Sequence, residues 1–370
     1  METFYNKAKK LFDETDISIN GIRPFDIQVH NDQFFQRIFA EGSLGLGESY
    51  MDGWWDCEVL DEFFRRIISA GLDRCIRPVR ELPVFLKARI LNLQDQSRAF
   101  IIGEHHYDIG DDLYESMLDS RMIYSCAYWK NADSLDKAQE NKLDLVFRKL
   151  GLKKGLRVLD IGCGWGGALK YAAEKYGVEG KGITVSANQA KKAADTCRNL
   201  PIEIHLQDYR ELDEQFDRIW SIGMIEHVGV KNYRTFMRIA RRCLKPDGLF
   251  LLHTIGGNRS VFKTDPWIER FIFPNSMIPS LRQLSLSWEQ LFVLEDLHNF
   301  GYDYAKTLKQ WNHNVNASLD KLSARYSERF FRMWRYYLLS CAGAFKARKL
   351  NVWQFVLSPN GVPGGYDSIR

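Results

Sequence analysis

The run VLDIGCGWGG at residues 158–167 restricts the fold of this chain more than any other feature of its sequence. An apolar stretch ends here at glycines that meet the spacing Gly-x-Gly-x-x-Gly. Glycines in this arrangement let the backbone turn tightly between a strand and a helix and approach a ligand closely. We therefore expect a strand over 157–161, a helix over 167–176 and a ligand site at the turn. The three glycines are Gly162, Gly164 and Gly167.

Short apolar runs and amphipathic helical segments alternate from about residue 151 onward. Strands joined by helical crossovers lie parallel in one sheet, with helices on both faces. Ligands of such sheets bind outside the carboxyl ends of the strands. We therefore predict an α/β fold with a Rossmann-like, doubly wound sheet of seven strands. The expected strands are 157–161, 180–185, 202–206, 216–222, 248–255, 292–297 and 352–357.

Residues 1–93 lack this alternation and show mostly helical spacing of apolar residues, as in LDEFFRRIISAGL. We interpret them as a small, mostly helical N-terminal domain that contacts lipid or a membrane surface. Polar residues at 94–103 are interpreted as a linker, and 104–370 as the domain that carries the site. Within that domain, we expect 258–285 and 302–346 to be insertions that form a lid over the pocket.

The overall charge of the chain excludes little, but its distribution is informative. The 370 residues include 51 Lys and Arg against 47 Asp and Glu, and the resulting formal charge of +4 is too small to indicate a nucleic-acid partner. One stretch combines basic with apolar residues, as is typical of a surface that contacts anionic lipid and equally of a solvent-exposed helical face. Its basic residues are Arg65, Arg66, Arg74, Arg77, Arg80, Lys87 and Arg89.

Seven cysteines are scattered without a Cys-x-x-Cys pair, as expected in a reducing compartment. The N-terminal residues METFYNKAKKLFDETD contain acidic residues and no long apolar signal-peptide core. No segment has the run of about 18 apolar residues that spans a bilayer. We therefore expect a cytoplasmic protein, peripheral at the inner face of the membrane. The adjacent histidines of GEHHYD lack metal-ligand spacing, so we expect no metal.

The residues around the glycines indicate which cofactor they hold. A dinucleotide fold requires an Asp or Glu about 20 residues further on to bind the ribose, but the second strand ends in Ile183, Thr184 and Val185. Asp160, close before the glycines, would repel a pyrophosphate and attract a cationic amino group. S-adenosylmethionine has such an amino group and no phosphate. We therefore predict a fold of the S-adenosylmethionine-dependent methyltransferase class.

The third predicted strand ends in QDYRE. There, Asp208 can accept a hydrogen bond from an adenine amino group, and Tyr209 can lie against the adenine ring. Asp208 is also typical of an Asx turn, which requires no ligand. Together with Asp160 and the glycines, these residues favour S-adenosylmethionine, and therefore transfer of a methyl or methylene group.

Ionisable residues follow the fourth and fifth predicted strands, where an acceptor would lie. Glu226 and His227 follow the fourth strand, and His253 and Ile255 stand at the end of the fifth. A carboxylate and an imidazole that face one pocket can act as the base for a methyl acceptor. Either side chain can also have a purely structural role, and the residues alone leave that alternative open.

Nine motifs, in order along essentially the whole chain, resemble those of the bacterial cyclopropane-fatty-acyl-phospholipid synthases. The related mycolic acid cyclopropane synthases share those of the catalytic half, whereas the N-terminal block is more similar to the phospholipid enzymes. The motifs are SLGLGESYMDGWW (43–55), HYDIGDDLY (106–114), YSCAYW (124–129), LDIGCGWGG (159–167), IGMIEHVG (222–229), LLHTIG (251–256), DPWIERFIFPN (265–275), NFGYDY (299–304) and SCAGAFKAR (340–348).

This resemblance implies a particular reaction. The cis double bond of an unsaturated acyl chain in a membrane phospholipid attacks the methyl group of S-adenosylmethionine and leaves a carbocation. The transferred methyl group then loses a proton and the ring closes, so that one methylene group is added. In this family a bound bicarbonate is the base. The matching residues here are Cys126, Glu226, His253, Ile255 and Tyr304.

The resemblance also implies how the cofactor is held. Tyr124 and Ser125 close over it, while Thr184 and Gln189 take its ribose and methionyl end, which accounts for the missing ribose acid. The full set of expected cofactor-binding residues is Tyr124, Ser125, Asp160, Gly162, Gly164, Trp165, Gly166, Thr184, Gln189, Asp208 and Tyr209.

Cys341 matches a cysteine that is assigned to the active site in this family, so we include it among the expected catalytic residues. A covalent nucleophile has no task in the alkylation of an alkene, however, and a thiolate requires a depressed pKa. Its neighbours in LLSCAGAFKAR are typical of a packed helix.

Three functions are therefore compared. The first is a cyclopropane synthase acting on membrane phospholipids. The second is a methyltransferase for another lipid or an amine, and the third is a catalytically silent lipid-binding protein with the same fold. The presence of Glu226, His253 and Tyr304 favours the first function. The resemblance also implies a homodimer.

Overall fold

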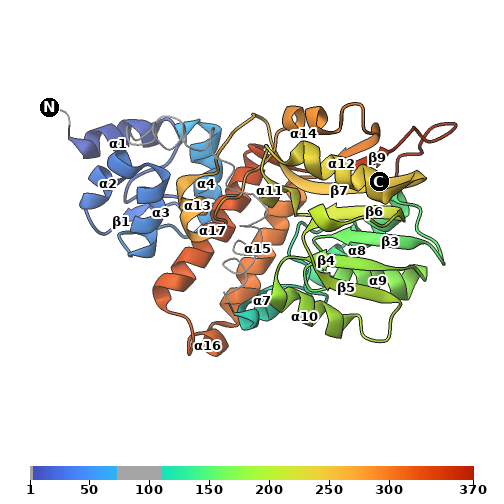
Figure 1. Cartoon of the computed structure of the whole chain (residues 1–370). Coiled ribbons are helices and arrows are strands. Elements are labelled where there is room, and N and C mark those ends of the chain that lie inside the picture. The colour runs from blue at the N-terminus through green and yellow to red at the C-terminus, as the bar shows by residue number, and fades with distance from the viewer. Residues whose placement is uncertain (1–2, 73–109) are drawn as a thin grey trace. The chain divides into compact units, whose positions relative to one another are not determined.

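The computed structural model describes residues 3–72 and 110–370, which form two compact units (Figure 1). The first unit contains residues 3–72, 263–274 and 304–350. The second unit contains residues 110–262, 275–303 and 351–370. The predicted linker at 94–103 lies outside the described residues, as do Arg74, Arg77, Arg80, Lys87 and Arg89.

A seven-stranded sheet forms the centre of the second unit and confirms the predicted α/β, Rossmann-like fold. Its order is β5-β4-β3-β6-β7-β9-β8. Strands β3 to β7 pair in parallel, and β8 is antiparallel to β9. The strands are β3 (Arg157–Ile161), β4 (Glu179–Thr184), β5 (Ile202–Leu206), β6 (Phe216–Ile222), β7 (Leu244–Gly257), β8 (Val293–Asn299) and β9 (Leu350–Ser358).

The strand bounds follow the predictions closely except at β7. There, Leu244 already pairs with Phe216, ahead of a shift in register between Phe216 and Arg218. The predicted turn KPDG is therefore included in the strand, because pairing with β6 resumes directly after it.

Two hydrophobic cores lie on opposite faces of this sheet, because successive residues of a strand point to opposite sides. Leu159 and Ile219 belong to one core, whereas their neighbours Val158 and Trp220 belong to the other. The first core includes residues of α11 (Ile225–Val228), α12 (Tyr233–Cys243) and α14 (Leu281–Trp288), and the second includes residues of α8 (Leu135–Lys149) and α9 (Gly167–Tyr176). Further elements of this unit are α7 (Asp111–Met117), α10 (Ala187–Thr196) and the single-turn helix η3 (Tyr209–Glu211).

The first unit is mostly helical, as predicted for the N-terminal part of the chain. It differs from the predicted division in that residues 263–274 and 304–350, both expected in the lid of the other domain, belong to it. Its elements are α1 (Phe4–Asp13), β1 (Gln28–Val29), α2 (Gln33–Glu41), α3 (Ser43–Met51), β2 (Trp55–Asp56), α4 (Leu60–Ser69), α13 (Pro266–Phe271), most of α15 (Tyr302–Ala317), α16 (Leu319–Leu322) and α17 (Glu328–Lys346).

Packing between distant segments explains this composite unit. Trp267 of α13 lies against Tyr336 of α17, with ring centroids 4.5 Å apart. An added Cβ at Gly343 of α17 would lie 2.4 Å from Cβ of Phe64 in α4. Such contacts join segments that are far apart in sequence, so local patterns did not predict them.

Two basic residues that were considered as membrane contacts are engaged in ion pairs. Arg65 bonds Glu62, with Nε 2.9 Å from each carboxylate oxygen. Arg66 bonds Asp16 at 2.7 Å and lies over the ring of Phe25 at 3.8 Å. These pairs favour the alternative of a structured helical face for Arg65 and Arg66.

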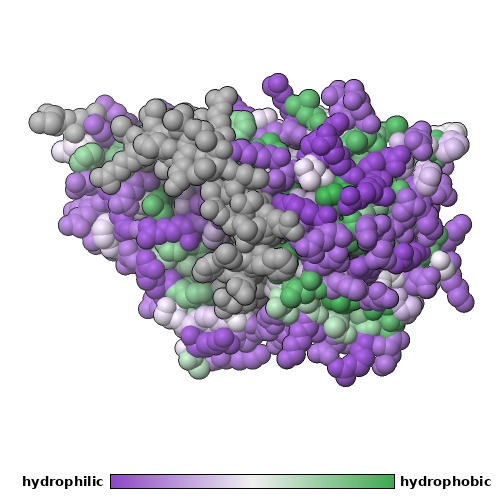
Figure 2. All heavy atoms as spheres, viewed as in Figure 1, coloured by the Kyte–Doolittle hydropathy of each residue, from purple (hydrophilic) through white to green (hydrophobic). Residues whose placement is uncertain are grey.

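The coloured part of the face drawn in Figure 2 is mainly polar. Figure 2 shows hydrophilic residues over most of the drawn surface, with hydrophobic residues in small groups among them. Within the described ranges, none of the helices has the length and apolar character needed to cross a bilayer.

The close approach of α17 to α4 generates a first prediction. We expect Gly343→Val to lower the free energy of unfolding by about 1–3 kcal/mol, because the added side chain has no space between the helices. Ser340→Val on the same helix is the control for a β-branched residue in α17. Chemical denaturation and limited proteolysis of residues 3–72 measure the effect. Equal stability of the two variants would contradict this packing.

Candidate active site

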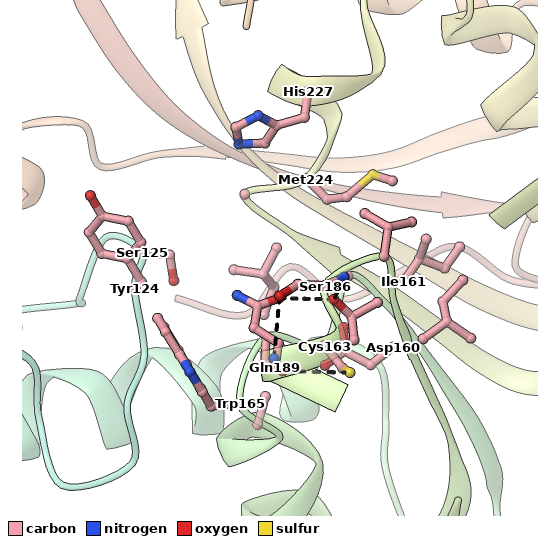
Figure 3. Close-up of a pocket in the computed structure, with 18 of the residues that line it drawn as sticks. Tyr124, Ser125, Asp160, Ile161, Cys163, Trp165, Ser186, Gln189, Met224 and His227 are labelled. Carbon is pink, nitrogen blue, oxygen red and sulfur yellow. Dashed lines mark hydrogen bonds between the residues drawn. The ribbon is translucent and has the colours of Figure 1, made fainter. Parts of the chain in front are cut away.

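A pocket lies at the carboxyl ends of β3, β4, β5 and β6, where the sheet topology predicts a ligand. In the view of Figure 3, Tyr124 and Trp165 lie on the left of the pocket, Asp160 and Ile161 on the right, and His227 at the top. All of the predicted cofactor-binding residues except Gly166 line it. Gly166 is instead the N-cap of α9, with a φ of 83°.

The glycine loop between β3 and α9 is held tightly against its neighbours. The backbone N–H groups of Gly162 and Cys163 both donate to the carbonyl of Ile183, at 3.0 and 2.9 Å. Gly162 has a φ of +91°, and a Cβ there would lie 2.9 Å from Cγ of Met224. A Cβ at Gly167 would lie 2.0 Å from the carbonyl oxygen of Arg121. Gly162 therefore requires glycine chiefly for its backbone conformation, and Gly167 for lack of space.

Asp160 is the ionisable group at the end of β3. Its side chain is buried, and its Oδ1 has no hydrogen-bond partner in the part of the chain that the structure describes. Burial raises the pKa of Asp160 to about 7, and the positive charge of Lys142 opposes this shift. Because a buried carboxylate without a partner is costly, Asp160 is suited to pair with a cationic ligand group.

The end of β4 carries a hydrogen-bonded network in place of a ribose-binding acid. The hydroxyl group of Thr184 donates to Oε1 of Gln189 at 2.9 Å. Oγ1 of Thr184 also accepts from the backbone N–H of Ser186 at 3.2 Å. This network fixes the carboxamide of Gln189, whose NH₂ group then remains to donate toward the pocket.

Asp208 and Tyr209 lie at the end of β5 as predicted, but Asp208 has protein partners. Its Oδ1 accepts from the backbone N–H of Arg210, and its Oδ2 accepts from Nη1 of Arg210, both at 2.9 Å. The turn alternative considered for Asp208 is therefore realised. Tyr209 packs against Phe236 with ring centroids 5.3 Å apart, and burial raises the pKa of Tyr209 to about 12.

Glu226 and Ile255 are brought together from α11 and β7. The backbone N–H of Ile255 donates to Oε1 of Glu226 at 2.7 Å. Oε2 of Glu226 is buried, and no described residue bonds it. Burial raises the pKa of Glu226, and the bond from Ile255 opposes this rise. One carboxylate oxygen is thus oriented by the backbone, while the other remains available to a ligand.

His253 lies on the same strand and is also buried. Its Nδ1 is 3.3 Å from Nε2 of Gln354 on β9. Burial, followed by the charges of Lys142 and Lys149, lowers the pKa of His253 well below its usual value. The imidazole is therefore neutral. Because the amide of Gln354 donates to Nδ1, the proton of the ring resides on Nε2.

The other predicted catalytic residues have different surroundings. Cys126 is buried, and its thiol donates to the carbonyl of Ala127 at 3.2 Å. Tyr304 belongs to the first unit, where its ring lies 4.8 Å from that of Phe345. Cys341 belongs to α17 of the same unit, and burial raises its pKa to about 12. A protonated thiol is a poor nucleophile, so Cys341 is not suited to covalent catalysis.

None of the six predicted catalytic residues is among the described residues that line the pocket. Ionisable residues outside the predicted catalytic set line it instead, among them His227, which the sequence had offered as a base, and Lys142, which it had not. His227 follows Glu226, and burial lowers its pKa to about 4. Lys142 of α8 is fully buried at the pocket. The spacing of Lys142 from Ala138 and Val146 places it on the apolar face of α8, and that signal is present in the sequence.

Comparisons with known proteins agree with this architecture. The family model of mycolic acid cyclopropane synthetase matches residues 94–355. The chain is 51% identical to cyclopropane-fatty-acyl-phospholipid synthase of Escherichia coli, over 98% of this chain and 95% of that protein. It is 35% identical to cyclopropane mycolic acid synthase 1 of Mycobacterium tuberculosis, over 68% of this chain and 94% of that protein.

Solved structures give the same result. The cyclopropane synthase MmaA2 from Mycobacterium tuberculosis has a TM-score of 0.66 and 32% identity, and the match covers 70% of this chain and 97% of that one. A mycolic acid cyclopropane synthase complexed with S-adenosylhomocysteine and CTAB has a TM-score of 0.65 and 34% identity, with the same coverage.

The fold and the pocket define an enzyme of the S-adenosylmethionine-dependent methyltransferase class. The residues present fit this cofactor, because Asp160 offers a buried oxygen without a described partner to its ammonium group and the glycine loop leaves no room for a Cβ at Gly162. The sequence comparisons are more specific than the class. The chain belongs to the mycolic acid cyclopropane synthetase family.

The pKa of Asp160 generates a second prediction. We expect the affinity for S-adenosylhomocysteine to be highest above pH 7 and to fall as the pH drops through about 7, because a protonated Asp160 no longer attracts the ammonium group of the ligand. Asp160→Asn is expected to bind more weakly and to lose most of this pH dependence. Isothermal titration calorimetry between pH 6 and 8 measures both effects, with Asp195→Asn on the exposed part of α10 as control.

Asp160→Asn weakens ligand binding, but it is expected to stabilise the ligand-free protein. The pKa of Asp160 is higher in the folded state than the ordinary value of 3.8, so ionisation destabilises the fold increasingly as the pH rises from 4 to 7. At pH 8, Asp160→Asn is therefore expected to raise Tm. An unchanged pH profile of binding together with a lowered Tm would contradict the assignment of Asp160.

Proposed function

We propose that this enzyme transfers a methylene group from S-adenosylmethionine to the cis double bond of unsaturated acyl chains in membrane phospholipids. The proposal is supported by 51% identity, over 98% of the chain, to a protein named cyclopropane-fatty-acyl-phospholipid synthase. The observation that carries it is the buried carboxylate of Glu226, which is held by the N–H of Ile255 and has a second oxygen that no described residue bonds.

The cofactor supplies an electrophilic methyl group on a sulfonium centre. In the proposed reaction, a carbon of the alkene forms a bond to this methyl carbon as the bond from carbon to sulfur breaks, and the positive charge moves to the other alkene carbon. Loss of a proton from the new methyl group and closure of the ring complete the product. A base is therefore needed for a proton bound to carbon, in a site that does not trap the cation.

We propose that bicarbonate is this base and that residues of α11 and β7 hold it. Glu226 can accept the hydroxyl proton of bicarbonate through Oε2, because Oε1 is already occupied by Ile255. His253 can donate from Nε2, because Gln354 occupies Nδ1. The family resemblance adds Cys126 and Tyr304 to the proposed set. With its pKa raised to about 12, Cys341 is omitted as a nucleophile.

The lipid substrate also implies a place in the cell. Because the double bond lies within a bilayer, we propose that the enzyme acts at the inner face of the membrane and draws the acyl chain toward the site. A homodimer is proposed from the family resemblance alone. The basic residues Arg74, Arg77 and Arg80 remain candidates for contact with anionic headgroups, whereas Arg65 and Arg66 are already paired.

A direct assay tests the reaction. We expect purified enzyme, incubated with methyl-labelled S-adenosylmethionine and vesicles of a monounsaturated phospholipid, to add one CH₂ to the lipid and to remove its olefinic proton signal. Mass spectrometry and NMR of the extracted lipid measure both. Label on a headgroup with the olefin intact would show that the headgroup, and not the double bond, is the methyl acceptor. Binding of S-adenosylhomocysteine without any transfer would indicate a catalytically silent protein.

Glu226 provides the corresponding mutational prediction. We expect Glu226→Gln to lower turnover by about 100-fold or more, because the amide oxygen is taken by the N–H of Ile255 and the NH₂ group that replaces Oε2 donates where the carboxylate accepted. Its affinity for S-adenosylhomocysteine should stay unchanged, because Glu226 does not line the cofactor pocket. Glu203→Gln, at an exposed position of β5, is the control.

The role of bicarbonate as the base is tested by removing it from the assay buffer. Turnover of the unmodified enzyme is expected to fall in carbonate-free buffer and to return when bicarbonate is added, while Glu226→Gln responds weakly. Turnover that is independent of bicarbonate would exclude it as the base. Loss of affinity for S-adenosylhomocysteine in Glu226→Gln would instead place this carboxylate in the cofactor site.

A further inference from the structure

Lys142 is a fully buried lysine at the edge of the cofactor pocket. It lies in the middle of α8, on the face that packs toward the sheet. Removing an ammonium group from water is costly, so a buried lysine normally has a charged or hydrogen-bonded partner. The partners of Lys142 therefore indicate its role.

The hydrogen-bond partner of Lys142 is the side chain of Ser125, with Nζ 2.9 Å from Oγ. Burial lowers the pKa of Lys142 to about 8, so the ammonium form still dominates at neutral pH. Nζ in this form only donates, and Oγ of Ser125 must therefore be the acceptor. The hydroxyl proton of Ser125 remains free to donate to an acceptor in the pocket, which Ser125 also lines.

The backbone beside this serine is fixed as well. Nε2 of Gln139, three residues before Lys142 on α8, donates to the carbonyl of Ser125 at 2.8 Å and to that of Ile123 at 3.1 Å. Two side chains of α8 thus hold the segment that carries Ser125 at the pocket. The orientation of its hydroxyl group is consequently determined by α8.

The charge of Lys142 also acts on Asp160. Both residues are buried and line the same pocket, and their opposite charges interact. Burial favours the neutral form of Asp160, whereas the nearby ammonium group favours the carboxylate. A pocket that presents one carboxylate and one hydroxyl donor supported by a cation is complementary to a zwitterion with an ammonium and a carboxylate group.

We propose that Lys142 is a positioning residue for the amino-acid end of S-adenosylmethionine, orienting the Ser125 hydroxyl group toward the carboxylate of the ligand and maintaining Asp160 as the partner of its ammonium group. This role concerns the cofactor and does not depend on which acceptor the enzyme methylates. We expect the adenosine end near Asp208 and Tyr209, which line another part of the pocket, so the role of Lys142 is confined to one part of the ligand.

Two ligands that differ in this part provide the test. S-adenosylhomocysteine carries the amino-acid group, whereas 5′-methylthioadenosine has the same adenosine and sulfur without it. We expect Lys142→Met to weaken the affinity for S-adenosylhomocysteine by about 10-fold or more, as for loss of hydrogen bonds to charged groups. The affinity for 5′-methylthioadenosine should change by less than about 2-fold. Calorimetric titration of the full-length protein measures both.

Lys149→Met is a closely matched control. Lys149 is a second buried lysine of the same helix, it pairs with Asp296 at 3.3 Å, and it does not line the pocket. Its substitution removes the same buried charge, and we expect it to leave the ratio of the two affinities unchanged. A selective loss in Lys142→Met but not in Lys149→Met would support the proposal.

A second variant keeps the proposal testable if Lys142→Met does not fold. Ser125→Ala is expected to weaken binding of S-adenosylhomocysteine selectively. In the double variant the combined loss should be smaller than the sum of the two single losses, because both act through the Ser125 hydroxyl group, although Lys142 also acts on Asp160. Equal weakening of both ligands by Lys142→Met, or no selective loss in either variant, would overturn the proposal. Selective loss with intact methyl transfer to any lipid would leave it standing.

Discussion

The burial of a carboxylate at the carboxyl end of β3 is the constraint on which the chemistry of this protein depends. Asp160 is buried there, so its charge must be balanced by the surroundings or by a ligand. The glycine loop that follows is bonded to Ile183 at the end of β4, and this contact closes the site around the carboxylate. The fold thus leaves a buried carboxylate whose negative charge a cationic group of the cofactor can balance.

A second group of buried polar residues lies on α11 and β7, and protein partners hold it differently. Glu226 and His253 each have one atom fixed by a protein partner, Ile255 in one case and Gln354 in the other. The fixed atoms determine which atoms remain to bind a further group. Burial favours the uncharged form of both side chains, because it raises the pKa of Glu226 and lowers that of His253.

Much of the fold could be predicted from local patterns. The strand Arg157–Ile161 and the helix Gly167–Tyr176 were predicted with their observed bounds, because the apolar run and the glycines are encoded within ten residues. The segments expected to form a lid on the site domain differ from the prediction. In the structure, residues 263–274 and 304–350 belong to the same compact unit as the N-terminal helices. Contacts such as Gly343 with Phe64 connect segments that share no local pattern.

The cofactor site shows the same division. The order of residues along the chain was sufficient to place Asp160 and the glycine loop at this edge, because parallel strands deliver consecutive loops to one edge of a sheet, whereas Thr184 and Gln189 were expected from the family resemblance. The role of Lys142 depends instead on which face of α8 meets the sheet and on the 2.9 Å contact with Ser125. Hydrogen-bond partners, burial and the resulting pKa values arise only when distant segments pack together, and packing alone determines which charged side chains lose their water.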